Sequence, residues 1–181
     1  MKCTACRQGT LQPSFMDSLF RAHTCDYCGG NWVFIEDFLA WREQNSEYDF
    51  AQNFRLEEDV EETSRALLCP VTGAIMTKFR ISTNTHHRVD YSASVGGVWL
   101  DKGEWQLLKK EGVAGHLSSI VTQSWQDDVR RQGTKESFEA IYLSRFGEED
   151  YKKAKALREW FQAHPKKADL RCYIFIDDPY S

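Results

Sequence analysis

Two pairs of cysteines near the N-terminus constrain the fold of this chain more than any other feature of its sequence. Cys3 and Cys6 form the first C-x-x-C pair, and Cys25 and Cys28 form the second after eighteen intervening residues. Each C-x-x-C turn offers two sulfurs on one side of a tight loop, and two such turns at this separation are typical of a tetrahedral zinc site. We expect these four cysteines to bind one structural Zn²⁺, because four protein ligands leave no position for water or substrate.

The residues around the cysteines predict a small β ribbon closed by a helix. Residues 10–24, TLQPSFMDSLFRAHT, fit two short antiparallel strands, and apolar residues recur with helical spacing from Ile35 to Trp41. Zinc binding supplies on the order of 10–16 kcal/mol in small peptides, enough to organise a segment too short for its own core. His23 lies two residues before Cys25, but a surface or strand histidine beside a complete thiolate set is favoured over a ligand.

This pattern has a family resemblance. The run C-x-x-C, ribbon, CDYCGGNW and a short helix with acids in its first turn resembles the bacterial transcription-factor-IIB-type zinc-finger family, whose usual form is C-P-x-C followed by C-x-x-C-G-G-x-W-L-D-x-x-E-L. The resemblance covers residues 3 to about 42. Thr4 stands where the family usually has proline, and VFIEDF replaces the leucine and aspartate at the helix entry. The resemblance implies a zinc-ribbon fold, but it does not imply that this chain is a transcription initiation factor.

A second stretch repeats the pattern without most of its cysteines. A shift of 67 residues aligns CDYCGGNW (Cys25–Trp32) with SASVGGVW (Ser92–Trp99), and a shift of 66 aligns Cys3 with Cys69. Cys69 is the one cysteine at the four ligand positions of this copy; the other three hold Thr72, Ser92 and Val95. We therefore expect a metal-free ribbon, in which apolar packing replaces the metal. The expected stabilising residues are Phe79, Tyr91, Val95 and Trp99.

Two histidines fall in the middle of this second copy. Residues 74–82 (AIMTKFRIS) and 88–93 (RVDYSA) predict two strands joined by a turn around Asn84. His86 and His87 lie near that turn and are expected to be ordinary exposed histidines. A rescued metal site that joins them to Cys69 is the less favoured alternative.

The chain divides by pattern into four segments, and the predicted fold class is α+β. Residues 1–42 are the zinc ribbon with its closing helix, residues 43–66 are an acidic linker, residues 67–110 are the altered ribbon, and residues 111–181 are helical. The linker could let the first ribbon move relative to the rest, or it could fold against the body and fix both ribbons together.

The C-terminal region carries three helical patterns and an apolar end. The patterns run over Leu117–Trp125, Phe138–Phe146 and Tyr151–Phe161, with stops at Gly147 and Pro165. The last stretch, LRCYIFIDDPYS at residues 170–181, is expected to be a buried strand or an extended tail. Its Cys172 is expected to be an inert buried thiol.

The overall charge argues against nucleic acid as the default partner. The formal net charge is −4 and the pI is about 5.8, so the chain has no general attraction for phosphate backbones. A local basic face on the third helical pattern is interpreted as a solvated surface rather than a phosphate-binding patch. Its members are Lys152, Lys153, Lys155 and Arg158. The sequence shows neither an export signal nor an apolar run long enough to span a membrane, so we expect a cytoplasmic protein without a membrane partner.

These patterns favour a binding function over catalysis. We find no nucleophile paired with a base, no phosphate-binding glycine loop and no open metal site, so we expect no catalytic residues. The favoured hypothesis is a non-enzymatic zinc-ribbon protein that acts as a protein-interaction module or adaptor, with its N-terminal ribbon docked on another protein. The alternative is a nucleic-acid-binding or transcription-associated regulator, in which the four basic residues would contact phosphate.

Overall fold

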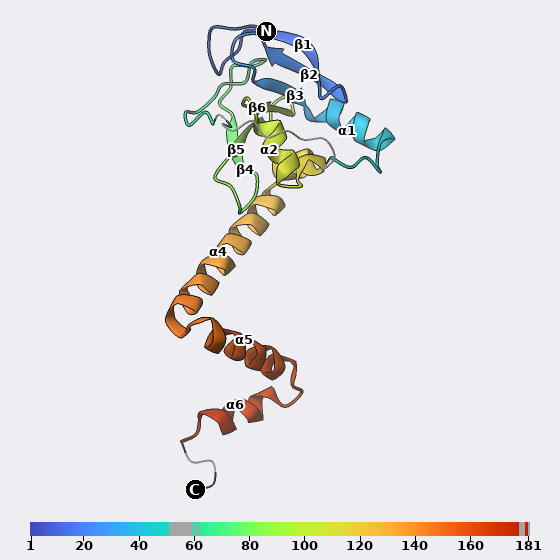
Figure 1. The fold of residues 1–181 in the computed structure, drawn as a ribbon. Coiled ribbons are helices and arrows are strands. Elements are labelled where there is room, and N and C mark those ends of the chain that lie inside the picture. The colour runs from blue at the N-terminus through green and yellow to red at the C-terminus, as the bar shows by residue number, and fades with distance from the viewer. Residues whose placement is uncertain (51–59, 61, 178–179, 181) are drawn as a thin grey trace. The chain divides into compact units, whose positions relative to one another are not determined.

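The computed structural model describes residues 1–50, 60, 62–177 and 180, and this part of the chain has an α+β fold (Figure 1). The strands are β1 (Leu11–Met16), β2 (Phe20–Cys25), β3 (Asn31–Phe34), β4 (Thr77–Arg80), β5 (Arg88–Ser92) and β6 (Gly97–Leu100). The helices are α1 (Ile35–Gln44), α2 (Glu104–Lys110), α3 (Leu117–Ile120), α4 (Gln123–Phe146), α5 (Glu148–Ala163) and α6 (Lys167–Phe175), with a 3-10 turn at Ala114–His116. None of the described helices is long and apolar enough to cross a lipid bilayer. The chain divides into two compact units, Met1–Gln132 and Gly133–Ser181.

All six strands of the first unit belong to one antiparallel sheet with the order β1-β2-β3-β6-β5-β4. The sheet consists of two three-stranded halves, and β3 pairs with β6 where the halves meet. Of the two alternatives left open for the linker, a first ribbon that moves relative to the second does not fit this structure, because the two are hydrogen-bonded within one sheet. Most of the predicted acidic linker, residues 51–59 and 61, lies outside the described residues.

The contact between the halves is centred on two tryptophans that lie 67 positions apart in the sequence. Trp32 of β3 lies directly opposite Trp99 of β6, and both side chains are fully buried. Each indole also lies over a glycine of the other strand: a Cβ atom added to Gly30 would collide with the ring of Trp99, and one added to Gly97 would collide with the ring of Trp32. The second glycine of each G-G-x-W motif is thus required by the tryptophan of the other half.

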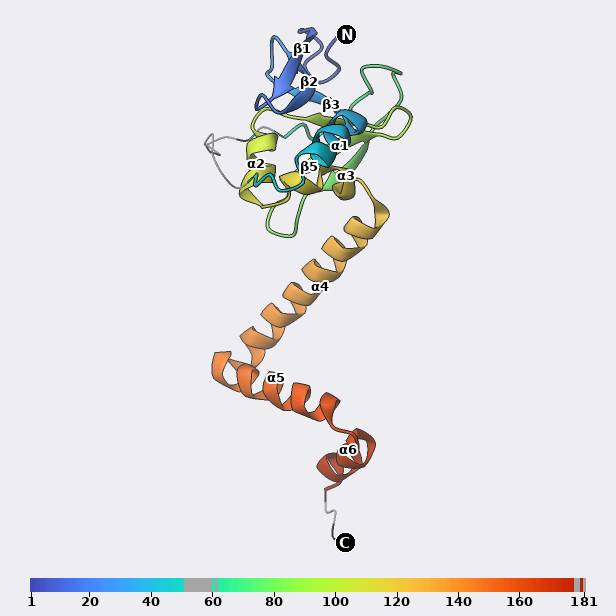
Figure 2. The same cartoon turned by 90° about the vertical axis from the view of Figure 1, so that its right-hand side faces the viewer.

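The two faces of the sheet bury different cores, because successive side chains of a strand point to opposite faces. Val33 and Val98 lie on the face that α1, α2 and α3 cover, and the views in Figures 1 and 2 show these helices beside the sheet. Trp32 and Trp99 belong to the opposite core, which also contains the N-terminal cysteines. The metal-ligand candidates and the contact between the halves therefore share one hydrophobic cluster.

The helical face joins the halves a second time. The ring of Phe20 in β2 packs edge-to-face on Phe38 of α1 and on Trp105 of α2, with both centroid distances at 5.4 Å. In the turn between β1 and β2, the Asp17 carboxylate accepts hydrogen bonds from Trp105 Nε1 (2.8 Å) and from Lys109 Nζ. Because the first half is tied to α2 in this way, residues of both halves belong to the same folding unit.

The second unit is helical, and its helix ends follow the predicted signals. α4 ends at Phe146 before Gly147, which has a positive φ of 77°, and α5 ends just before Pro165. The expectation of a strand or extended tail is wrong for residues 170–175, which belong to helix α6. A helix satisfies its own backbone hydrogen bonds, whereas a strand here would need a neighbouring strand to pair with. Cys172 is exposed, so the prediction of a buried thiol is also wrong.

We predict that Gly30→Ala and Gly97→Ala each lower the free energy of unfolding of the first unit, by about 1–3 kcal/mol, because the new methyl group has to displace a buried indole. The matched control is Gly115→Ala, since Gly115 has ordinary space, 3.4 Å to the ring of Phe50. Urea unfolding followed by tryptophan fluorescence measures the effect. A Gly97→Ala protein as stable as the control would show that the close approach of Trp32 and Gly97 is not required.

Candidate metal centre and a buried acidic cluster

The four predicted ligands converge at one end of the first half. Cys3 and Cys6 lie in the turn before β1, Cys25 ends β2, and Cys28 lies in the turn that leads to β3. The Cys3 and Cys28 sulfurs are 3.8 Å apart, those of Cys6 and Cys25 are 3.7 Å apart, and all four lie within 4.8 Å of one another. A tetrahedron whose corners lie about 2.3 Å from its centre, as in zinc–thiolate sites, has edges of about 3.8 Å. The donor set and its spacing therefore fit a tetrahedral thiolate-binding metal ion.

Backbone geometry fixes these sulfurs in place. Amide N–H groups point at three of them: Cys6 N lies 3.5 Å from Cys3 Sγ, Gly9 N lies 3.3 Å from Cys6 Sγ, and Cys28 N lies 3.5 Å from Cys25 Sγ. A Cβ atom on Gly9 would collide with Cys25 Sγ, so glycine is required where the first turn passes the second. The amides are arranged to stabilise negative charge on the sulfurs, which is the form that binds metal.

The thiols differ in their acidity. Burial raises the pKa of Cys3 to about 11, and it also raises the pKa of Cys28. For Cys6, the effect of burial is outweighed by amide hydrogen bonds from Gly9 and Gln8, which lower its pKa to about 6. Neutral thiols are therefore favoured at two of the positions, and binding of a cation would release their protons.

The second half keeps the backbone of these turns but not the ligands. Cys69 N–H donates to Ala74 O at 2.8 Å and Cys69 O accepts from Gly73 N at 2.9 Å. The aligned Cys3 likewise donates to Gly9 O at 2.9 Å and accepts from Arg7 N at 3.1 Å. Within the described part of the chain, the N-terminal cysteines are the only cluster of three or more possible ligand residues that could hold a metal ion.

Hydroxyl groups occupy the equivalent positions in the second half. Ser94 Oγ lies 3.0 Å from Ser92 Oγ and 3.3 Å from Thr72 Oγ1. Burial raises the pKa of the Cys69 thiol, but hydrogen bonds from Ser92 and Thr72 outweigh burial, so this pKa lies below its ordinary value. A hydrogen-bonded thiol and hydroxyl network therefore stands where the first half has four thiols.

The histidines do not join the cysteines. His23 lies in β2 outside the group of possible ligands, as expected. His86 is exposed in the loop between β4 and β5. His87 was also expected to be exposed, and this is wrong: its side chain is 23% exposed, and its Nδ1 lies 3.8 Å from the buried carboxylate of Glu104.

Glu104 belongs to a cluster of buried acids that the sequence analysis did not identify. Glu104 and Asp90 are each 1% exposed, and Asp101 is also buried. Asp101 accepts hydrogen bonds from Thr63 N (2.6 Å) and from Trp99 Nε1 (2.7 Å), and Lys78 Nζ contacts Asp90 at 2.7 Å. The Thr63 contact ties the end of the predicted linker to the centre of the sheet.

A signal for this cluster exists in the sequence. In LDKGEW, an acid precedes Glu104 by three positions at the start of a helix, which is the spacing of a capping box. In the structure, Asp101 N–H donates to Glu104 Oε2 at 2.8 Å, which is one of the two bonds of that motif; the N-cap of α2 is Gly103, and no side chain caps the helix. The burial of both residues follows from the sheet that covers them, and this is not visible in the motif.

Burial also shifts the acidity of these groups. Burial raises the pKa of Glu104 to about 7, although His87 partly counters the shift. Burial raises the pKa of Asp90 to about 6 despite the neighbouring Lys78. The Glu104 carboxylate in turn raises the pKa of His87. His87 and Glu104 therefore form a buried pair whose protonation changes near neutral pH.

The four basic residues of the alternative hypothesis lie on α5 and are exposed. Three of them pair with carboxylates: Lys152 with Glu148 at 2.6 Å, Lys153 with Glu149 at 2.8 Å, and Lys155 with Glu139 at 2.9 Å. Their charge is therefore largely balanced on the helix surface. The fourth, Arg158, lies along a groove between α4 and α5.

Comparisons of the chain with protein-family models, with curated proteins and with solved structures find no match.

We predict that the purified protein contains one zinc ion per chain and that Cys25→Ser abolishes metal binding. Since β3 and β6 share a sheet, loss of the metal should destabilise all of Met1–Gln132 and not the first half alone. Elemental analysis and thermal unfolding measure the two effects, and Cys69→Ser is the control that keeps its zinc. Two zinc ions per chain, or none in protein purified without chelator, would overturn this assignment.

We predict that Glu104→Gln makes the first unit less sensitive to pH. The unfolded chain loses the Glu104 proton near its ordinary pKa of 4.5, whereas the folded chain keeps it to about pH 7, so stability falls as pH rises between these values. The raised pKa of His87 acts in the same direction, because the charged pair is lost as pH rises through that pKa.

Glutamine keeps the shape of the side chain without its charge. Glu104→Gln should therefore be more stable than wild type by about 1–3 kcal/mol at pH 8, with a smaller gain at pH 6. Urea unfolding of the metal-loaded protein at both pH values provides the measurement. An equal effect at the two pH values would show that the carboxylate does not titrate in this range.

Proposed function

We propose that this chain is a non-enzymatic protein-interaction adaptor, in which a structural zinc ion supports the binding surface. In this proposal both halves of the sheet are zinc ribbons of the transcription-factor-IIB type, and the second has lost its metal. Three features support the repeat: the 67-residue offset between the tryptophans, their reciprocal packing on glycines, and the similar backbone hydrogen bonds of the Cys3 and Cys69 turns.

The ligand chemistry supports a structural metal. Four thiolates complete the coordination of zinc, so no position is left for an activated water or a substrate. Cys3 and Cys25 are almost fully buried beside Trp32, so part of the site is closed to solvent. A metal in this setting contributes folding free energy to its turns.

The observation that carries the proposal is an exposed apolar patch beside these turns. Leu68 and Ile75 pair through an isolated β-bridge, and Val71 lies in the turn between them. All three side chains are exposed, Ile75 at 74%. We call Leu68, Val71 and Ile75 the turn patch. Large apolar side chains grouped on a surface are typical of protein-binding sites.

The turn patch is also linked to the metal-binding turn. Thr4, which lies between Cys3 and Cys6, donates a hydrogen bond from Oγ1 to Leu68 O at 2.5 Å. The metal would hold the Thr4 turn, and that turn supports the backbone of the patch. This connection gives the zinc ion a role in binding without any role in chemistry.

Nucleic acid is the weaker candidate as a partner. Lys152, Lys153 and Lys155 face carboxylates of the same unit, and a polyanion would have to displace these pairs. The chain carries a formal net charge of −4. No observation on the described residues favours a phosphate backbone over a protein surface.

We predict that the combined variant Val71→Ser/Ile75→Ser loses a protein partner that wild type retains. Affinity capture from a cell lysate, read by mass spectrometry, compares wild type, this variant and Phe15→Ser. Phe15 is also exposed, but it lies at the opposite end of β1 from the cysteines, so it serves as the control. Cys25→Ser should lose the same partner, because its turns are no longer held.

Binding of duplex and single-stranded nucleic acid at two salt concentrations is measured in parallel. Steeply salt-dependent affinity that disappears when Lys152, Lys153 and Lys155 are changed to glutamate would replace the adaptor proposal with the regulator hypothesis. Equal capture of all proteins by wild type and the Val71→Ser/Ile75→Ser variant would reject the turn patch as the binding surface.

A further inference from the structure

The helices of the second unit leave most of their apolar side chains uncovered. Neither α5 nor α6 buries a single side chain. The exposed large apolar residues of the unit are Phe138, Ile141, Tyr142, Leu143, Phe146, Leu157, Trp160, Tyr173, Ile174, Phe175, Ile176 and Tyr180. Helices of 16 and 9 residues are marginally stable in water without packing, so this unit needs a covering surface.

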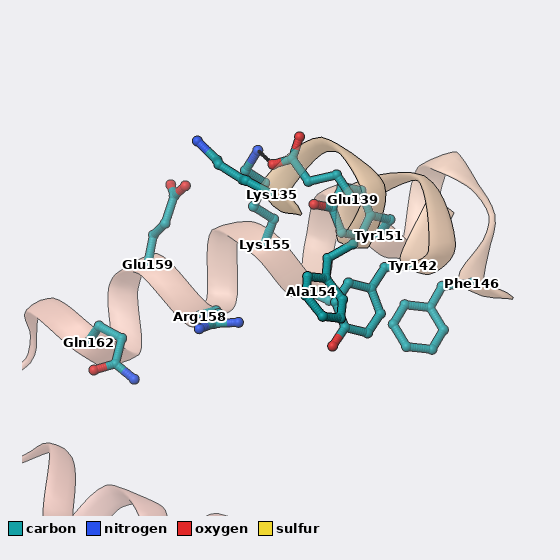
Figure 3. Close-up of a pocket in the computed structure, with 11 residues that line it drawn as sticks. Lys135, Glu139, Tyr142, Phe146, Tyr151, Ala154, Lys155, Arg158, Glu159 and Gln162 are labelled. Atoms are coloured by element: carbon teal, nitrogen blue, oxygen red, sulfur yellow. Dashed lines mark hydrogen bonds and ion pairs between the residues drawn. The ribbon is translucent and has the colours of Figure 1, made fainter. Parts of the chain in front are cut away.

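The uncovered surface includes a groove of about 670 Å³ between α4 and α5 (Figure 3). On the α4 side, Phe138, Tyr142 and Phe146 recur at i, i+4 and i+8 and form an apolar stripe. Tyr142 stacks on Phe146 with ring centroids 5.7 Å apart. The ring of Tyr151 in α5 lies nearly parallel to the ring of Tyr142, with centroids 6.5 Å apart. The two helices therefore hold an aromatic wall that faces solvent instead of closing on each other.

The charges along the groove have both signs. Lys135, Lys155 and Arg158 line it together with Glu139 and Glu159. Residues 133–181 contain nine lysines and arginines and nine aspartates and glutamates, so this unit has no formal net charge. A strongly anionic partner, such as nucleic acid or an acidic membrane, would meet the two glutamates inside the groove.

We propose that the groove binds the same groove of a second copy of this chain, so that α4 and α5 of two chains form a four-helix contact around a two-fold axis. A two-fold contact uses one surface twice and must therefore be self-complementary. Lys155 and Glu139 pair within their own chain at 2.9 Å. Glu159 of each chain can still face Lys135 or Arg158 of the other, so the mixed-sign rim meets this requirement. The aromatic stripes of both chains then bury each other, as in the core of a four-helix bundle.

Self-association also explains why the α4 and α5 helices of one chain leave their apolar stripe exposed. A single pair of helices cannot enclose an apolar stripe on both sides, whereas four helices can. Net neutrality removes the repulsion that two charged copies would feel. The second unit would thus gain its core from the partner chain.

Sedimentation velocity on the full-length, metal-loaded protein over a concentration range of roughly 1–100 µM tests the proposal. Wild type should sediment as a dimer, with twice the 21.0 kDa chain mass. Phe138→Asp should shift the protein to monomer, because it places a charge on the aromatic stripe. The matched control is Trp160→Asp: Phe138 is 53% exposed and Trp160 is 52% exposed, but Trp160 does not line the groove, and this variant should stay dimeric.

Unchanged zinc content and tryptophan fluorescence of Phe138→Asp would show that the first unit is intact. A monomeric wild type over the whole range, or equal dimerisation of the two variants, would overturn the proposal. A monomer whose bound partner from lysate is lost in Phe138→Asp but kept in Trp160→Asp would assign the groove to a different protein and also reject self-association. The adaptor proposal is tested separately, since its variants lie in the turn patch and leave this groove unchanged.

Discussion

The reciprocal packing of Trp32 and Trp99 is the contact on which the first unit depends. Each indole fills the space above a glycine of the other half, and the two rings lie opposite each other in the strand pair that joins the halves. This pairing sets the register between β3 and β6, and a slip of one residue would put the two indoles on opposite faces of the sheet. The G-G-x-W motif is therefore a device for joining two half-sheets. That role accounts for the presence of the motif in both halves, although only the first half has the four clustered cysteines.

The halves are held by different means once they are joined. In the second half, Trp99 Nε1 donates to the buried Asp101, whose carboxylate also holds Thr63. The first half has Phe34 at the equivalent position, and Trp32 Nε1 has no hydrogen-bond partner. A polar network thus supports the second half, whereas the first half has the cluster of four cysteines. Such a network is costly when it is incomplete, and the raised pKa values of Glu104 and Asp90 show the cost of burying these acids. The first half has a different requirement, because its thiols must lose their protons before they can bind a metal ion.

The sequence predicted local features well and long-range ones poorly. The convergence of the four cysteines, the strands around them and the helix ends at Gly147 and Pro165 were predictable, because metal geometry, alternation and capping act over a few residues. The single six-stranded sheet was not, because strand pairing between distant segments has no periodicity of its own. The buried His87 and Glu104 pair was missed for the same reason. Residues 170–175 show the limit of composition: an apolar run predicted a buried strand or an extended tail, but these residues form a helix.

The two units reach stability under different conditions. Met1–Gln132 contains its own core, and a metal ion held by its four cysteines would stabilise the folded state according to its free concentration and affinity. In Gly133–Ser181, the sequence marks the helix ends clearly, but neither α5 nor α6 has a buried side chain. The stability of this unit therefore depends on the surface that covers its helices. A protein built in this way can lose order in the second unit without unfolding the first. Covering the helices and loading the metal are then two separate controls on one chain, each acting through binding to the folded state.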